Sequence, residues 1–242
     1  MMARATPAIW ALIPAAGRGT RFGGEVPKQY LQIDGRPLIA HALDALLAHP
    51  NIDGAVVALA AGDALWPGWA TRHGKPVVRC EGGGERADSV LAALHALPAG
   101  IDADALVLVH DAARPNLHAI DIDRLIDAAM AHVDGAILAA PVRDTLKRAR
   151  QSVSAPIIDA TEPRERLWRA LTPQAFRRDL LLDALSRASG DGVYVTDEAM
   201  AVERLGRHPR LVEGREDNIK VTTPADLALV TFAMAHHTRT FP

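Results

Sequence analysis

The stretch from residue 9 to residue 30 constrains the fold of this chain more than any other. It opens with the apolar run Ile9–Ile13, which is typical of a buried parallel strand, and Pro14 ends that run. A loop of alanines and glycines follows, in which small side chains let backbone N–H groups approach an anion closely. The cations in and after this loop are Arg18, Arg21 and Lys28. The stretch therefore predicts a strand followed by a loop that holds a polyphosphate.

Two better-known glycine motifs are excluded. The dinucleotide-binding pattern G-x-G-x-x-G fails because Phe22 stands where its third glycine belongs, after Gly17 and Gly19. The P-loop pattern fails because Gly24 is followed by Glu25 rather than by lysine. An ordinary glycine-rich turn between a strand and a helix explains the glycines, but it does not explain the cations among them.

Composition excludes several classes of protein. The 242 residues carry 27 basic and 29 acidic side chains, with no block of like charge, which argues against nucleic acid or a membrane as the main partner. Cys80 is the single cysteine, so an internal disulfide is impossible and a reducing compartment, the cytoplasm, is expected. No apolar run approaches the ~18 residues of a spanning helix.

The order of strand-like and helix-like segments indicates the fold class. Apolar runs at residues 55–60 and 105–109 alternate with helical spacing at residues 38–49 and 121–132. This alternation is typical of βαβ units. We expect one α/β domain over residues 1–242, Rossmann-like, with a mostly parallel twisted sheet flanked by helices.

A second glycine platform, residues 82–84, precedes a helical segment. It brings backbone N–H groups and a helix N-terminus beside an open space, where a flat ring or a phosphate could bind. Arg86 and Ser89 follow one helical turn apart and can face the same ligand.

A carboxylate follows the most strand-like run. Ligands of open α/β sheets bind beyond the carboxyl ends of the strands, and Asp111 stands at such an end. A carboxylate there can hold Mg²⁺ together with phosphate oxygens. Asp111 could instead cap the following helix. His110 is interpreted as a packed supporting residue rather than as a base.

Later segments are less regular. Residues 141–163 are charged and lack a core pattern, which indicates an arm that leaves the main body. Thr196 stands before a helical run, where capping and substrate contact are both open interpretations. Residues 218–222 are expected to form a final strand.

Together these motifs resemble the nucleotidylyltransferases that activate sugars and polyols. Their P-A-A-G-x-G-x-R signature stands at residues 14–21, and P-K-Q-Y-L at residues 27–31 narrows the resemblance to the 2-C-methyl-D-erythritol 4-phosphate cytidylyltransferase family. Further matches are G-G-x-x-R-x-x-S, H-D-A-A-R-P at residues 110–115, and N-I-K-V-T at residues 218–222. Gly84 takes a place that is often Asp in relatives.

The resemblance implies a cytidylyl transfer from CTP to a polyol phosphate, a divalent cation such as Mg²⁺, and a homodimer formed through the arm. It implies nucleotide contacts from Pro14, Ala15, Ala16, Gly17, Gly19, Arg21, Lys28, Gly83, Gly84, Arg86, Ser89, Asp111 and Ala112. It implies catalytic roles for Arg21, Lys28, Arg164 and Lys220, and metal binding by Asp111. It implies acceptor contacts from Asp111, Arg114, Thr145, Arg164, Thr172, Thr196 and Lys220. Arg166 competes with Arg164 for its position.

Two other functions remain open from the sequence. A uridylyl- or guanylyltransferase, or a ribitol 5-phosphate cytidylyltransferase, would share much of the nucleotide machinery. A nucleotide-sensing module without catalysis would bind CTP and release no pyrophosphate.

Overall fold

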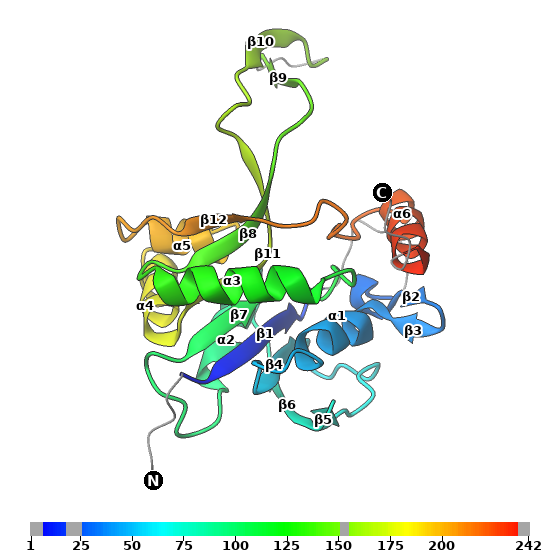
Figure 1. Cartoon of the computed structure of the whole chain (residues 1–242), viewed down its shortest axis with the longest axis vertical. Helices are drawn as coiled ribbons and strands as arrows, with labels where there is room; N and C mark the ends of the chain where they lie inside the picture. Colours follow the sequence, from blue (N-terminus) through cyan, green and yellow to red (C-terminus); the bar gives the residue numbers. More distant parts are fainter. Residues whose placement is uncertain (1–6, 18–25, 151–154, 237–242) are drawn as a thin grey trace.

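A computed structural model describes residues 7–17, 26–150 and 155–236 (Figure 1). Its centre is an eight-stranded sheet in the order β12-β8-β11-β7-β1-β4-β6-β5. The pairs β1–β4, β1–β7, β4–β6 and β8–β12 are parallel, whereas β11 runs antiparallel to both of its neighbours. The prediction of a mostly parallel sheet is confirmed. The strands of this sheet are β1 Ile9–Ala15, β4 Gly54–Leu59, β5 Thr71–Arg72, β6 Lys75–Glu81, β7 Leu106–Val109, β8 Ala136–Pro141, β11 Trp168–Arg177 and β12 Arg210–Glu213.

Alternate residues of β1 face opposite sides of the sheet, and both sides are buried. Ile9, Ala11 and Ile13 pack in one core with α1 and α3, while Trp10 and Leu12 pack in the other with α2, α4 and α5. Burial on both faces explains why β1 reads as a continuous apolar run. Figure 1 shows α3 crossing in front of the sheet. The helices are α1 Leu38–Leu47, α2 Arg86–His95, α3 Ala119–Ala131, α4 Arg178–Gly190, α5 Glu198–Glu203 and α6 Pro224–Ala235.

The order of the strands creates the position of the site. From the carboxyl end of β1 the chain goes on to β4 on one side of the sheet, and from the carboxyl end of β7 it goes on to β8 on the other side. Strands β1 and β7 are neighbours, so the connections at their carboxyl ends lead away from each other and leave a crevice between them.

A hairpin projects from the body of the molecule. Its strands β9 (Leu146–Ala149) and β10 (Ile158–Glu162) pair with each other rather than with the main sheet. Figure 1 shows this arm extending beyond the ends of β8 and β11. The excursion expected at residues 141–163 is therefore a hairpin arm.

One expected strand is absent. Residues 218–222 are neither strand nor helix among the described residues; they form a loop that enters α6. The segment is nevertheless held in place, because the Val221 backbone N–H donates to the Ala113 carbonyl at 2.8 Å and the Val221 side chain is fully buried. Its apolar residues reflect packing in a small cluster with Ile33, Leu38 and Val230. The remaining short elements are η2 Lys28–Tyr30, β2 Gln32–Ile33 and β3 Arg36–Pro37.

Candidate active site

A cavity of about 580 Å³ opens at the carboxyl ends of β1, β6 and β7. Its size suits a nucleotide-sized ligand. Most of the residues that the sequence proposed for the nucleotide line it. These are Pro14, Ala15, Ala16, Gly17, Lys28, Gly83, Gly84, Arg86, Ser89, Asp111 and Ala112, together with Thr196 and Lys220 from the acceptor set. Gly19 and Arg21 lie outside the described residues.

The segment that carries Lys28 is fixed at the end of β1. Gln29, which is buried, donates from Nε2 to the carbonyl of Ala15 at 2.8 Å. This bond places η2, and therefore Lys28 at its first residue, beside the strand end. The P-K-Q motif thus has a structural component in Gln29 and a cation in Lys28 that faces the cavity.

The glycine platform packs directly against the first loop. A Cβ on Gly82 would lie 2.6 Å from the Cβ of Ala16, and one on Gly83 would lie 2.2 Å from the Cβ of Asp88. Ser89 Oγ accepts from the Gly83 backbone N–H at 3.2 Å, so this hydroxyl shapes the platform. A Cβ on Gly84 would find open space, with its nearest neighbour, Asp88 Oδ2, 4.0 Å away.

A capping box begins helix α2 behind the platform. The side chains of Glu85 and Asp88 each accept a hydrogen bond from the other residue's backbone N–H. This arrangement fixes the first turn of the helix and so fixes the origin of the Arg86 side chain.

Asp111 is the centre of a cluster of charges. Its Oδ1 accepts from Arg86 Nε at 3.0 Å, and its Oδ2 lies 2.8 Å from Lys220 Nζ and 3.4 Å from Arg114 Nε. Burial favours the neutral acid, but Arg86, Lys220 and Arg114 outweigh it and hold the pKa of Asp111 well below its usual range. Asp111 is therefore ionised at neutral pH.

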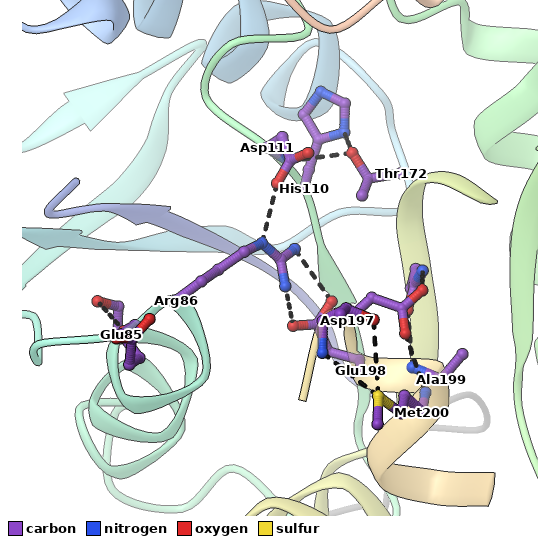
Figure 2. A network of polar contacts seen from close by, with 12 residues as sticks. Glu85, Arg86, His110, Asp111, Thr172, Asp197, Glu198, Ala199 and Met200 are labelled. Carbon is purple, nitrogen blue, oxygen red and sulfur yellow. Dashed lines mark hydrogen bonds and ion pairs between the residues drawn. The ribbon is translucent and has the colours of Figure 1, made fainter. Parts of the chain in front are cut away.

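The backbone beneath Asp111 is supported by His110 and Thr172. Thr172 Oγ1 accepts from the Asp111 backbone N–H at 3.1 Å and lies 3.0 Å from His110 Nδ1 (Figure 2). On the other side of the ring, His110 Nε2 lies 3.0 Å from the Arg114 carbonyl. Burial lowers the pKa of His110 to about 4. A neutral ring with its proton on Nε2 fits these contacts: Nε2 donates to the Arg114 carbonyl, and Nδ1 accepts from the Thr172 hydroxyl, whose oxygen accepts from the Asp111 N–H. The interpretation of His110 as a supporting residue agrees with this geometry, and the Thr172 hydroxyl takes part in the same support.

Asn218 ties the loop of residues 218–222, here called the Lys220 loop, to His110 and Thr172. The Asn218 side-chain Nδ2 donates to the Thr172 backbone carbonyl at 2.7 Å, and the Asn218 backbone carbonyl accepts from Arg114 Nη1 at 2.7 Å. Arg114 is buried with its guanidinium between Asp111 and this loop, so it orients the cluster from behind and does not line the cavity.

The structure excludes two open interpretations, in which Asp111 or Thr196 caps a helix. Asp111 does not cap a helix, because α3 begins only at Ala119 and the carboxylate binds cations. Thr196 does not cap α5, because the N-cap is Asp197, whose Oδ1 accepts from the Met200 backbone N–H at 2.9 Å. Thr196 lines the cavity instead.

Thr145 and Arg164 are not brought to this cavity. Both are exposed and belong to the arm region, where Arg164 Nη1 donates to the carbonyl of Arg143. Arg166, the competitor of Arg164, is also exposed there. None of the three lines the cavity of its own chain.

The sequence did not single out Glu198 and Gln174. Glu198 is 1% exposed and binds Arg86, and Gln174 binds the N-terminus of α5. Glu198 follows an N-cap signal. Acidic residues are common in the first turn of a helix, so nothing in the sequence set Glu198 apart from an ordinary helix start. Gln174 belongs to the L-T-P-Q run of β11 and carries no separate signal.

The cavity at the divergent strand ends, the glycine platform and the cluster of cations define a nucleotide-binding α/β protein equipped to hold phosphates. The sequence model of the family described as IspD, 2-C-methyl-D-erythritol 4-phosphate cytidylyltransferase, matches residues 9–236. The chain belongs to this family.

Individual relatives agree with the family assignment. A 2-C-methyl-D-erythritol 4-phosphate cytidylyltransferase of Xanthomonas campestris pv. campestris strain 8004 is 63% identical over 234 residues, which cover 97% of this chain and 87% of the relative. A Xanthomonas axonopodis pv. citri protein of the same name is 62% identical over 96% of this chain and 86% of its own length.

Solved structures of similar proteins share the fold. A crystal structure of a 4-diphosphocytidyl-2C-methyl-D-erythritol synthase matches with a TM-score of 0.80 and 36% identity, over 95% of this chain and all of that chain. The Francisella tularensis 2-C-methyl-D-erythritol 4-phosphate cytidylyltransferase matches with a TM-score of 0.78 and 31% identity, over 93% of this chain and 99% of that one.

Proposed function

We propose that this chain transfers the cytidylyl group of CTP to 2-C-methyl-D-erythritol 4-phosphate and releases pyrophosphate. Family membership supports the substrates. The observation that carries the proposal on the structural side is the convergence of Lys28, Arg86, Asp111 and Lys220 on one cavity at the switch between β1 and β7.

The acceptor needs no general base. A phosphate monoester has a second pKa of about 6, so it is already a dianion at neutral pH and can attack the α-phosphorus of CTP directly. The new bond joins an acceptor phosphate oxygen to that phosphorus, and the bond to the β-phosphate oxygen breaks. Catalysis then consists of positioning two polyanions and stabilising the charge between them.

The cations divide this work by position. Lys28 stands at the first loop and would bind the triphosphate and the leaving pyrophosphate, together with Arg21. Lys220 lies on the loop before α6 and would orient the attacking phosphate. Arg86 and the backbone of Gly83 and Gly84 would hold the nucleotide.

Asp111 would hold Mg²⁺ in this scheme. Among residues 7–17, 26–150 and 155–236, no group of three or more His, Cys, Asp or Glu side chains is placed to hold a metal. The single carboxylate of Asp111 fits an ion that takes its other ligands from phosphate oxygens and water. When bound, Mg²⁺ neutralises phosphate charge. The protein's part is to keep Asp111 ionised, and the surrounding cations do so.

The arm would form a homodimer and place Arg164 and Thr145 at the acceptor site of the partner. Its exposed apolar side chains support this proposal. Ile157 and Ile158 are 51% and 66% exposed, and Leu167 and Trp168 at the base of the arm are each 38% exposed. Such side chains on a projecting hairpin are suited to burial in an interface.

A location in the cytoplasm is proposed from the single cysteine, which fits a reducing compartment. Within the part of the chain that the structure describes, no helix combines the length and apolarity needed to cross a membrane.

A pyrophosphate-release assay across four nucleoside triphosphates and several acceptors tests the function. We expect turnover with CTP and 2-C-methyl-D-erythritol 4-phosphate, and much weaker turnover with UTP, GTP or ATP or with ribitol 5-phosphate. A preference for another base or for ribitol 5-phosphate would reassign the substrate. Binding of CTP without pyrophosphate release would indicate a sensing module.

A further inference from the structure

Glu198 is a buried carboxylate beside the cavity that the reaction scheme above does not use. It is the first residue of α5, is 1% exposed, and does not line the cavity, although Tyr194 and Thr196 just before it do. A charged side chain buried this deeply is costly unless it is paired. Burial raises the pKa of Glu198, and the neighbouring Arg86 opposes that rise.

Arg86 is the partner of Glu198, and it bridges two acidic residues. Its Nη1 donates to Glu198 Oε1, its Nη2 donates to Glu198 Oε2 at 3.1 Å, and its Nε donates to Asp111 Oδ1 at 3.0 Å. Figure 2 shows the guanidinium lying between the two carboxylates. The Glu198 contact is a two-pronged pair, which fixes the plane of the guanidinium as well as its position.

The carboxylate of Glu198 is itself held on a rigid frame. Gln174 of β11 donates from Nε2 to Asp197 Oδ2 at 2.9 Å, and its Oε1 accepts from the Ala199 backbone N–H at 2.9 Å. These two bonds flank Glu198 in the sequence and tie the start of α5 to the central sheet. Gln174 is 1% exposed, so both of these hydrogen bonds start from a side chain that is shielded from solvent.

Arg86 keeps donors that its two carboxylate partners do not use. A guanidinium carries five N–H groups, of which Glu198 takes two and Asp111 takes one. The two that remain are on Nη1 and Nη2 of a side chain that lines the cavity and is 26% exposed. The orientation of these donors is therefore set by Glu198.

We propose that Glu198 is a positioning residue for the nucleotide and acts through Arg86, whose free N–H groups it directs into the cavity. Without the Glu198 carboxylate, the guanidinium can rotate about its side-chain bonds and pair more fully with Asp111. It would then no longer present the same donors to a ligand. Glu198 itself touches neither substrate.

A double-mutant cycle on the full-length protein tests this inference, which rests on the proposed use of CTP. The variants are Glu198→Gln, Arg86→Ala and the two combined, and kcat and KM for CTP are measured at saturating acceptor. Glu203→Gln is the matched control, since it makes the same substitution at an exposed position of the same helix. Melting temperatures are recorded for all variants.

Glu198→Gln is expected to raise the KM for CTP about tenfold, or about 1.4 kcal/mol, with kcat close to that of the wild type. In the glutamine variant an amide NH₂ group takes the place of one carboxylate oxygen. It cannot accept a hydrogen bond from Arg86, so one of the two hydrogen bonds between the side chains is lost. In the Arg86→Ala background the same change should add no further rise in KM. It should also raise the melting temperature of that background, because it removes a buried charge left without a partner. Glu203→Gln should match the wild type.

Several outcomes would overturn the inference. An unchanged KM in Glu198→Gln would do so, as would effects on KM that multiply in the double variant, because Glu198 would then act independently of Arg86. If Glu198→Gln does not fold, Glu198→Asp serves in its place, since it keeps the charge and withdraws it by one methylene; an unchanged KM there is equally contradictory. Absence of CTP turnover in the wild type would instead refute the proposed function.

Discussion

At the scale of single residues, the site depends on keeping Asp111 ionised while several cations share it. Lys220, Arg86 and Arg114 supply three positive charges around Asp111 and Glu198, so the cluster carries one net positive charge. A site of this kind favours polyanions and loses little by exchanging its internal contacts for contacts to phosphate. Lys28 adds a cation from the first loop.

Lys28→Ala is expected to fold normally and to lose about 10²–10³ in kcat, the usual cost of removing one charge contact to a transition state. The physical reason is that Lys28 lines the cavity where the triphosphate would bind. Steady-state kinetics with CTP measure the effect. Arg187→Ala removes one exposed positive charge from α4 and serves as the control. A kcat near the wild-type value would remove Lys28 from the mechanism.

At the scale of elements, turns and helix starts place these residues. The glycine platform is an example in which adjacent glycines do different work. Gly83 has no space for a side chain against Asp88, whereas Gly84 faces open space.

Gly83→Ala is expected to destabilise the fold by ~1–3 kcal/mol, because its new methyl group would overlap Asp88 at the start of α2. Gly84→Ala is expected to change stability by less than about 1 kcal/mol, in either direction. Urea unfolding of both variants measures the difference. Equal losses of stability would contradict the packing described for the platform.

The Lys220 loop enters α6 through a second capping box, which predicts a dependence on pH. Asp226 Oδ2 accepts from Thr222 Oγ1 at 2.6 Å, from the Thr222 N–H at 2.9 Å and from the Thr223 N–H at 2.7 Å. These bonds, the Thr222 hydroxyl first, lower the pKa of Asp226 from its ordinary value of 3.8 to about 2. A lowered pKa stabilises the fold above pH 3.8, and this contribution is lost as the pH falls through about 2.

Asp226→Asn should therefore melt at a lower temperature than the wild type at pH 7, by an amount that reflects a cap worth about 1 kcal/mol. The gap between the two proteins should narrow as the pH falls from about 4 through about 2, because Asp226 becomes protonated in the folded protein over this range and below it neither side chain is charged. Thermal unfolding monitored by circular dichroism measures it. A gap that stays constant over this range would show that the charge of Asp226 does not contribute.

Much of the element pattern was predictable, for reasons that can be stated residue by residue. Strand β1 buries both faces and therefore reads as an uninterrupted apolar run. Residues 218–222 were wrongly predicted to be a strand for the same reason, namely buried apolar residues. Ile219 and Val221 pack in a small cluster but do not pair with a sheet. Glu198 could not be found, because nothing local in a sequence shows that a glutamate at a helix start meets an arginine 112 positions away.

At the scale of the whole molecule, the arm separates two groups of residues that the sequence assigned to one site. The cavity of one chain holds Lys220 and Asp111, while Thr145 and Arg164 lie in the arm region. A dimer that exchanges arms would reunite them, and the exposed Ile157 and Ile158 offer apolar contact area for it.

Ile158→Asp is expected to shift the protein from dimer to monomer and to reduce turnover, because a charge would be buried in the proposed interface. Sedimentation velocity measures the oligomeric state. Val133→Asp, which changes an exposed apolar residue just before β8, at the opposite end of that strand from the arm, should remain dimeric. A wild-type protein that sediments as a monomer would refute the role proposed for the arm.

The central claim is that the acceptor's own phosphate oxygen attacks CTP in this cavity, and isotope tracing tests it most directly. The acceptor, 2-C-methyl-D-erythritol 4-phosphate, is prepared with ¹⁸O in its non-bridging phosphate oxygens, incubated with CTP and the protein, and the products are examined by ³¹P NMR and mass spectrometry. The account predicts that all of the label stays in the cytidylylated product, including the oxygen that bridges its two phosphorus atoms, and that the pyrophosphate is unlabelled. Label in the pyrophosphate, or an unlabelled bridging oxygen, would contradict it.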